Sequence, residues 1–148
     1  MISLTGEYAL RAMIFLERHR DEWPISSPHI AEAAGIPPKY LSSILADLVR
    51  AGLLEGMRGK SGGFRITRPA KRIRLAEVIR SFEPVQVQRR PCPFGNVICN
   101  DAQPCGAHER WKGVKEALDR FLGETTLEDV AKKNHGVAGS DGRPRSKK

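Results

Sequence analysis

The pattern of apolar and polar positions predicts a chain built mainly from short helices. From Leu4 to His19, apolar residues return every three or four positions with charges between them, as in an amphipathic helix. Ser27-Pro28 predicts the start of a short helix through about Ala34, because the hydroxyl can cap free N–H groups and proline needs no partner there. Gly35 can adopt the positive φ that ends such a helix.

A second helix follows after a tight turn. Pro37 and Pro38 open it and Gly52 ends it. Its apolar positions form one stripe, at Leu41, Ile44, Leu45 and Leu48. Two helices joined by a turn of about three residues that contains glycine have helix-turn-helix spacing. Paired amphipathic helices also occur in other helical proteins, so this spacing alone does not identify the motif.

A glycine-rich basic hairpin comes directly after these helices. Leu53-Leu54-Glu55 and Phe64-Arg65-Ile66-Thr67 are typical of short strands, and the segment between them contains four glycines. Arg58 and Lys60 stand at its tip. A phosphate-binding nucleotide loop is less favoured, because no helix begins after the glycines. The order of elements instead predicts the wing of a winged helix-turn-helix domain.

The remaining elements are also helical. A short helix is expected around Leu75–Phe82 and a long one over about His108–Leu122. Thr125-Thr126-Leu127-Glu128 is typical of a capping box that begins a last short helix. From His135 onward apolar residues almost vanish, so we expect a disordered basic tail there. The fold class is therefore mainly α with a small β-hairpin.

Charge and composition restrict the partners. Lys and Arg number 25 against 17 Asp and Glu, which gives a net charge of +8, and mean hydropathy is −0.40. An excess of this size is expected where a protein neutralises DNA phosphates. Charges interrupt the N-terminal apolar stretch, and no apolar run reaches the roughly 20 residues that span a bilayer. We expect a cytoplasmic protein without a membrane partner.

The sequence offers no enzyme signature. Neither a nucleophile–base pair nor a nucleotide fingerprint stands out among its residues. A basic wing would also have no purpose in an electron-transfer protein or enzyme. We therefore predict a binding protein.

The cysteines provide the most specific chemistry. Cys92, Cys99 and Cys105 lie within one short stretch, and His108 follows three residues after the last of them. Three thiolates and an imidazole suit a soft or borderline metal centre. The spacing leaves three interpretations open: an iron–sulfur cluster, a structural Cys3His zinc site, or metal-free thiols that oxidise to a disulfide. The short knuckle that structural zinc favours is missing, which favours iron–sulfur slightly.

Together these segments resemble the IscR/NsrR family of winged-helix transcription regulators over about residues 1–133. The resemblance is carried by Leu4-Thr5, Tyr8-Ala9-Leu10-Arg11, Pro38-Lys39-Tyr40-Leu41, Arg58-Gly59-Lys60-Ser61-Gly62-Gly63-Phe64, and the three cysteines before a long helix. It implies a homodimer and an iron–sulfur cluster, [2Fe-2S] favoured and [4Fe-4S] possible, whose state controls operator affinity. The implied cluster ligands are Cys92, Cys99 and Cys105. The implied dimer interface is Trp111, Val114, Leu118, Phe121 and Leu122.

Two departures from the family affect this assignment. The first gap between cysteines is six residues here, where five is common. The fourth ligand also varies: His108 matches the histidine of IscR-like members, and Glu7 matches an N-terminal carboxylate that NsrR-like members take from the other subunit. We favour His108, because it is tethered beside Cys105, and keep Glu7 as the alternative. His19, His29 and His135 are expected to face solvent.

The predicted function is that of a bacterial, nucleoid-associated regulator, by default a repressor, on a near-palindromic double-stranded operator. Two recognition helices would enter major grooves about 34 Å apart. The residues expected at the DNA are Ser27, Pro38, Lys39, Tyr40, Ser42, Ser43, Arg58, Gly59, Lys60 and Ser61. The predicted division is a winged helix-turn-helix domain (1–83), a cluster-binding loop (84–107), a dimerisation helix with a short terminal helix (108–133) and a basic tail (134–148). The sensed signal stays open between nitric oxide, iron supply, cluster demand and oxidants.

Overall fold

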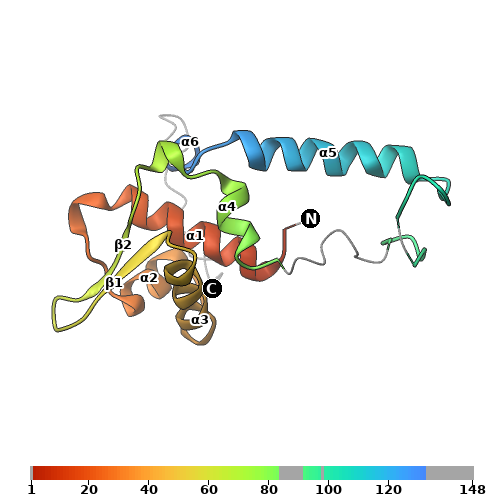
Figure 1. The fold of residues 1–148 in the computed structure, drawn as a ribbon. Helices are drawn as coiled ribbons and strands as arrows, with labels where there is room; N and C mark the ends of the chain where they lie inside the picture. Colours follow the sequence, from red (N-terminus) through yellow and green to blue (C-terminus); the bar gives the residue numbers. More distant parts are fainter. Residues whose placement is uncertain (1, 84–91, 98, 133–148) are drawn as a thin grey trace, which may run out of the picture.

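A computed structural model describes residues 2–83, 92–97 and 99–132 of the chain (Figure 1). The helices are α1 (Leu4–Arg18), α2 (Ser27–Ala34), α3 (Pro38–Arg50), α4 (Leu75–Arg80), α5 (His108–Glu124) and α6 (Leu127–Ala131), with 3-10 turns η1 (Arg20–Glu22) and η2 (Ala70–Arg72). The strands are β1 (Leu54–Met57) and β2 (Gly63–Ile66), which pair antiparallel. The mainly helical fold with one hairpin confirms the predicted fold class. The predicted basic tail, 134–148, lies outside the described residues.

Helix α1 is the centre of the body, and α2, α3, α4 and α6 all pack against it. Its inner face buries Met13 and Leu16 completely. The predicted stripe of α3 is core, since each of its four residues is at most 1% exposed: Leu41, Ile44, Leu45 and Leu48. The helical periodicity therefore identified the buried face of α3, which leaves its opposite face for solvent or a ligand.

The turn between α2 and α3 is fixed by backbone geometry. Gly35 ends α2 with φ 65°, in the left-handed region that the sequence predicted for it. The residue that caps α2 is Ser26 and not Ser27, and Ser26 makes no side-chain capping bond. Ser27 is the first helical residue instead, and Pro28 follows in the first turn. This places the start of α3 at the surface, directly after a buried Ile36.

The hairpin is anchored by a third segment that sequence patterns did not predict. Phe64 exchanges backbone hydrogen bonds with Ile25, at 2.8 and 3.1 Å, so β2 pairs on its second side just before α2. A Cβ at Gly63 would lie 2.3 Å from the Ile25 carbonyl, which only glycine avoids. The wing is thereby fixed next to the helix-turn-helix.

Helix α5 leaves the body as a long arm, with the cysteine loop at its far end (Figure 1). Its near end is held by two backbone bonds: Leu75 N–H donates to Thr125 O at 3.0 Å, and Leu127 N–H donates to Ile73 O at 2.8 Å. The capping box of α6 uses Thr126 with Asp129, where the sequence had suggested Glu128 as the partner. Arg18 then donates to the carbonyls of Val130 and Ala131, which docks α6 on α1.

Candidate functional site

The start of α3 presents the residues predicted to contact DNA. Pro38, Lys39, Tyr40, Ser42 and Ser43 are all exposed there. The hydroxyl of Ser43 donates to Tyr40 O at 3.0 Å, and that of Ser42 donates to Pro38 O at 3.4 Å. Both hydroxyl oxygens keep lone pairs that can accept from a base or a backbone amide. Ser27 is half-buried and lines an open groove between α2 and α3 together with Pro38 and Ser42.

Tyr40 takes part in a series of stacking and cation–π contacts. Its ring stacks on that of Tyr8 from α1 at a centroid distance of 6.2 Å. Lys39 Nζ lies 4.8 Å from the Tyr40 ring centre, and the Arg11 guanidinium lies 5.7 Å from that of Tyr8. Such cation–π contacts restrict long side chains without burying their charge. These contacts therefore join α1 to the start of α3 and place two cations, Arg11 and Lys39, beside the two rings.

The tip of the wing is exposed throughout, from Arg58 to Ser61. Within the described part of the chain, neither Arg58 nor Lys60 forms an ion pair, so both cations are available to a phosphate. The stem below them is different, because Arg65 pairs with Glu55 across the strands at 2.8 Å. Charge is thus neutralised along the stem and left free at the tip.

The thiols of Cys99 and Cys105 both lie close enough to Cys92 to affect its pKa. Cys92 is 4% exposed and sits in a tight turn whose backbone N–H groups, those of Phe94 first and of Asn96, point at its sulfur. These donors, with the thiols of Cys105 and Cys99, hold the pKa of Cys92 below its usual range, against the opposing effect of burial. All three cysteines are free thiols. A sulfur surrounded by donors favours its thiolate form, the form that binds metals.

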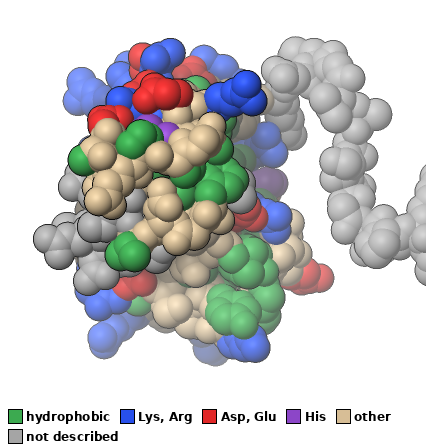
Figure 2. Space-filling model, turned by 90° about the vertical axis from the view of Figure 1, so that its right-hand side faces the viewer, with side chains coloured by type: hydrophobic (Ala, Val, Ile, Leu, Met, Phe, Trp, Pro, Cys, Tyr) green, Lys and Arg blue, Asp and Glu red, His purple; other side chains and the backbone are tan. Residues whose placement is uncertain are grey.

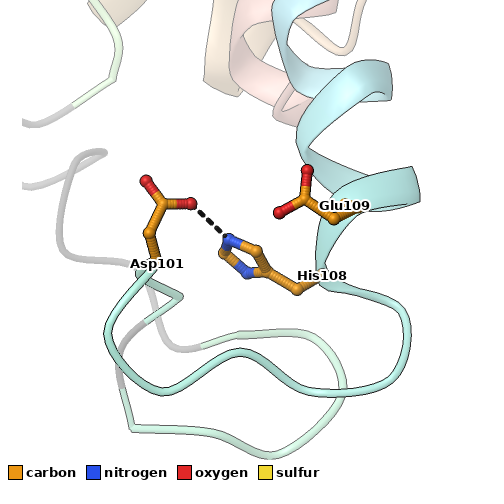
Figure 3. A group of neighbouring side chains, drawn as sticks. All are labelled: Asp101, His108 and Glu109. Carbon is orange, nitrogen blue, oxygen red and sulfur yellow. Dashed lines mark hydrogen bonds and ion pairs between the residues drawn. The ribbon is translucent and has the colours of Figure 1, made fainter.

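His108 lies beside these thiols and is only 5% exposed. Its Nδ1 atom is 3.5 Å from Cys99 Sγ, and its Nε2 atom is 2.9 Å from Asp101 Oδ1 (Figure 3). The hydrogen bond from His108, followed by one from Lys112, holds the pKa of Asp101 below its usual range. Asp101 is therefore ionised at neutral pH and must accept from Nε2–H. In the neutral imidazole this leaves the Nδ1 lone pair directed towards Cys99 Sγ.

Asp101 is a site residue that sequence patterns missed. It lies two positions after Cys99, and its partner Lys112 lies four positions after His108. These spacings are the signal in the sequence that could have suggested Asp101. The donor atoms of Asp101, His108 and Glu109 lie within 4.8 Å of one another (Figure 3). Lys112 Nζ already contacts both Asp101 oxygens, at 3.1 and 3.3 Å, and so competes with any cation there. This carboxylate fits better as the partner that orients His108.

Glu7 is not near the cysteine loop within this chain. It is exposed in the first turn of α1, whereas the loop lies at the outer end of α5 (Figure 1). The histidines that were expected to face solvent differ in their exposure. His29 is exposed, but His19 is half-buried, with Nδ1 2.8 Å from Phe15 O and its ring against that of Phe15. His135 lies outside the described residues.

Helix α5 leaves apolar side chains uncovered. Val114 is 55% and Phe121 is 51% exposed, and Trp111 and Leu118 are half-buried. Leu122, the fifth residue assigned to this face, is 8% exposed because it packs on Leu75 and Ile79 of α4. Seen from the cysteine-loop end of the molecule, several hydrophobic side chains are exposed in the middle of the face, with Lys and Arg mainly at its upper and lower edges (Figure 2).

Comparison with known proteins shows the family to which the chain belongs. A profile of the Rrf2 family, described as "Iron-dependent Transcriptional regulator", matches residues 2–133. The chain belongs to the Rrf2 family. The IscR regulator of Xenorhabdus nematophila is 34% identical over 127 residues, which cover 86% of this chain and 76% of that protein. Rrf2 membership agrees with the IscR-like resemblance of the sequence and confirms it.

Solved structures of two regulators share the fold. IscR of T. potens superposes with a TM-score of 0.71 at 27% identity, covering 94% of this chain and 93% of that one. CymR, the global cysteine regulator of B. subtilis, also gives 0.71, at 29% identity over 88% of this chain and 95% of its own.

The Rrf2 relatives are transcriptional regulators and not enzymes, so this chain is a DNA-binding transcription regulator without a catalytic role. In the described residues, no helix is long and apolar enough to cross a membrane.

Proposed function

We propose that this Rrf2 protein is a homodimeric repressor whose operator affinity depends on an iron–sulfur cluster bound by Cys92, Cys99, Cys105 and His108. In this proposal residues 1–83 bind DNA, 84–107 hold the cluster, 108–133 form the dimer and 134–148 are a basic tail. The protein would act on the bacterial nucleoid in the cytoplasm.

The observation that carries the proposal is the orientation of the His108 ring. In the neutral imidazole Nε2–H donates to the ionised Asp101, which leaves the Nδ1 lone pair facing Cys99 Sγ at 3.5 Å. Metal-binding histidines usually donate their second ring N–H to a carboxylate or carbonyl in this way. The imidazole is also buried, although a polar residue at a helix start would ordinarily face water.

The donor set fits an iron–sulfur cluster. Three thiols and one imidazole match the combination of soft and borderline ligands that such iron centres take. These residues also lie at the N-terminal end of α5, a 17-residue helix whose free N–H groups favour negative charge. A bound cluster would supply a one-electron redox centre that oxidants and nitric oxide can attack. Three cysteines with one histidine favour [2Fe-2S], and a fourth carboxylate ligand such as Glu7 would favour [4Fe-4S].

Ligation would act on DNA binding through the residues of α5. The proposed ligands join the cysteine loop to the first turn of α5. The whole helix is about 25 Å long. Its other end is fixed to the body by the Thr125 and Leu127 backbone bonds. A change in how the loop is held would therefore move one end of a rigid helix whose opposite end is fixed beside α4. The uncovered Val114 and Phe121 would pack against a second copy, so this movement would alter the spacing of two DNA-binding bodies.

DNA contacts in the proposal follow the exposed groups of the body. Lys39, Tyr40 and Ser43 would contact base edges or phosphates in the major groove. Arg58 and Lys60 would enter the minor groove or bind phosphate beside it. A two-fold dimer would recognise a near-palindromic operator with half-sites about 34 Å apart.

The decisive experiment is anaerobic purification followed by an absorption spectrum with iron and sulfide analysis. We expect brown wild-type protein with about two irons per chain. The His108→Ala variant should lose or change the visible spectrum, while the matched variant Glu7→Gln should keep it. A colourless protein that contains zinc would refute the cluster, and the reverse behaviour of the two variants would assign the fourth ligand to Glu7.

Operator binding provides the second half of this test. Apo and loaded protein are compared at the same salt concentration on an operator selected from random DNA, because phosphate contacts make affinity strongly salt-dependent. A difference of at least tenfold is expected. Equal affinities would contradict control by the cluster.

A metal-free thiol switch is the second candidate, and the lowered pKa of Cys92 is the observation that favours it. The Cys92 residue is only 4% exposed, which restricts access of an oxidant to its thiol. In that case operator binding should follow cysteine oxidation in protein that contains no metal.

A further inference from the structure

Helix α5 carries two lysines, one turn apart, that reach back to the cysteine loop. Lys112 Nζ lies 3.1 Å from Asp101 Oδ1 and 3.3 Å from its Oδ2. Lys115 Nζ donates to Cys99 Sγ at 3.8 Å. One lysine thus contacts the carboxylate that orients His108, and the other contacts a sulfur directly.

The two lysine ammonium groups have different neighbours. The Lys112 ammonium is paired with Asp101, and Glu109 and Glu116 also lie close enough to affect its pKa, which Asp101 raises most. Among the residues that the structure describes, Lys115 forms no ion pair with a carboxylate, and Cys99 Sγ is its hydrogen-bond acceptor. Within the described residues, the positive charge beside Cys99 is therefore not paired with a carboxylate, whereas the one beside Asp101 is.

We propose that Lys115 is a positioning residue that favours the reduced state of the bound cluster, through its ammonium hydrogen bond to Cys99 Sγ. The inference rests on the proposed function, since it assumes that Cys99 is a ligand. Reduction adds one electron from an external one-electron reductant, and no bond forms or breaks. The added negative charge is shared by the ligand sulfurs, so a donor with a positive charge beside one of them stabilises the reduced state more than the oxidised one.

The experiment measures the ratio of reduced to oxidised cluster by absorption, at one ambient potential fixed with dithionite and mediators. Lys115→Gln should lower this ratio about 3- to 10-fold, where tenfold corresponds to about 59 mV for one electron. Lys115→Arg keeps a charged donor and should restore the ratio to within about twofold of wild type. Because the contact is exposed, raising the salt concentration should narrow the difference between Lys115→Gln and wild type.

A matched control separates this contact from charge in general. Arg120→Gln removes an exposed cation from the same helix. It should change the ratio less than Lys115→Gln does. An unchanged ratio in Lys115→Gln, or an equal shift in Arg120→Gln, would overturn the inference.

Failures of the two proposals are distinguishable. Colourless wild-type protein overturns the proposed function and this inference with it, whereas loaded wild type with an unshifted Lys115→Gln overturns only the inference. If Lys115→Gln does not load, loading is compared in Lys115→Met and Lys115→Arg. Loading restored by arginine alone supports a charged hydrogen-bond donor to Cys99 Sγ, and loss of loading in all three variants contradicts it.

Discussion

The winged-helix body and the cysteine loop are stabilised by different interactions. The body is organised around fully buried side chains such as Met13, Leu16 and Leu48. In the described part of the loop, residues 92–97 and 99–107, Cys92 is the buried side chain, while Phe94 is 56% and Val97 is 85% exposed. The loop is instead shaped by backbone turns and by hydrogen bonds to sulfur and imidazole.

This difference indicates which region depends on a ligand. A hydrophobic core stabilises the body in proportion to the apolar area that it removes from water. A loop without such a core gains little from folding alone, so bound metal would contribute most of its order. Substitutions in the body should therefore change stability, and substitutions in the loop should change metal content and regulation while the body stays folded.

The largest effect is expected from a core truncation. Leu45 is 1% exposed, so Leu45→Ala removes buried methyl groups and leaves a cavity, which costs about 2–5 kcal/mol of unfolding free energy. Val97→Ala in the loop should change it by less than about 0.5 kcal/mol. Urea unfolding of the metal-free protein measures both. A loss in Val97→Ala as large as that in Leu45→Ala would abolish the distinction between the regions.

Glycines provide the next comparison. Gly63→Ala would place a Cβ 2.3 Å from the Ile25 backbone, which must shift and separate β2 from its third partner. We expect the unfolding free energy, measured in urea, to fall by on the order of 1–3 kcal/mol. DNA binding should also weaken, because the wing loses its pairing with Ile25. Around Gly106, in the loop, nothing lies within 4 Å of an added Cβ. Gly106→Ala should leave stability unchanged, and a wild-type-like Gly63→Ala would show that the Ile25 pairing is dispensable.

A smaller effect, confined to DNA binding, is expected at the wing tip. Arg58 is exposed and unpaired in the described structure, so Arg58→Gln should leave stability unchanged but remove about one phosphate contact. Operator affinity should fall about 3- to 10-fold, and the slope of log affinity against log salt should decrease by roughly one. Arg120→Gln, which removes the same charge from α5, is the control. Equal losses in both variants would indicate an effect of net charge rather than of the wing.

How far the sequence predicted these regions follows from the kind of interaction in each. The stripe Leu41–Leu48 and the turn at Gly35 were predictable, because periodicity and a positive φ are local properties of the chain. The pairing of Ile25 with Phe64 was not, since it joins segments far apart in sequence and has no composition signal. Strand limits also shifted, with β1 beginning at Leu54 rather than Leu53.

The residues proposed as metal ligands could be chosen from the sequence, whereas the residues that contact them could not. Three cysteines and His108 stand out by residue type and spacing. Asp101, Lys112 and Lys115 are ordinary charged residues, and only the folding of the loop back onto α5 brings them to His108 and Cys99. The partial burial of His19 was also missed, although it comes from a local contact: its ring packs on that of Phe15 one turn earlier in the chain.

The smallest predicted effect is the pH dependence of stability at the capping box of α6, where α5 meets the body. The backbone N–H of Thr126, and then its hydroxyl, hold the pKa of Asp129 below its usual range in the capping box of α6. Because the folded-state pKa is lowered, ionised Asp129 stabilises the fold at neutral pH, and this contribution is lost as the pH falls through the usual aspartate value of about 3.9 towards the lower folded value. Asp129→Asn should therefore lower the melting temperature near pH 7, and its difference from wild type should shrink as the pH approaches 3.

The matched loop variant is Asp101→Asn, whose carboxyl also has a lowered pKa but contacts His108 and Lys112 rather than the body. Its melting temperature in the metal-free protein should follow wild type at every pH, because the core does not depend on the loop. Melting curves of both variants between pH 7 and pH 3 provide the measurement. A constant difference between Asp129→Asn and wild type would assign the effect to the shape of the side chain rather than to its charge. Destabilisation by Asp101→Asn would show that the loop supports the body even without metal.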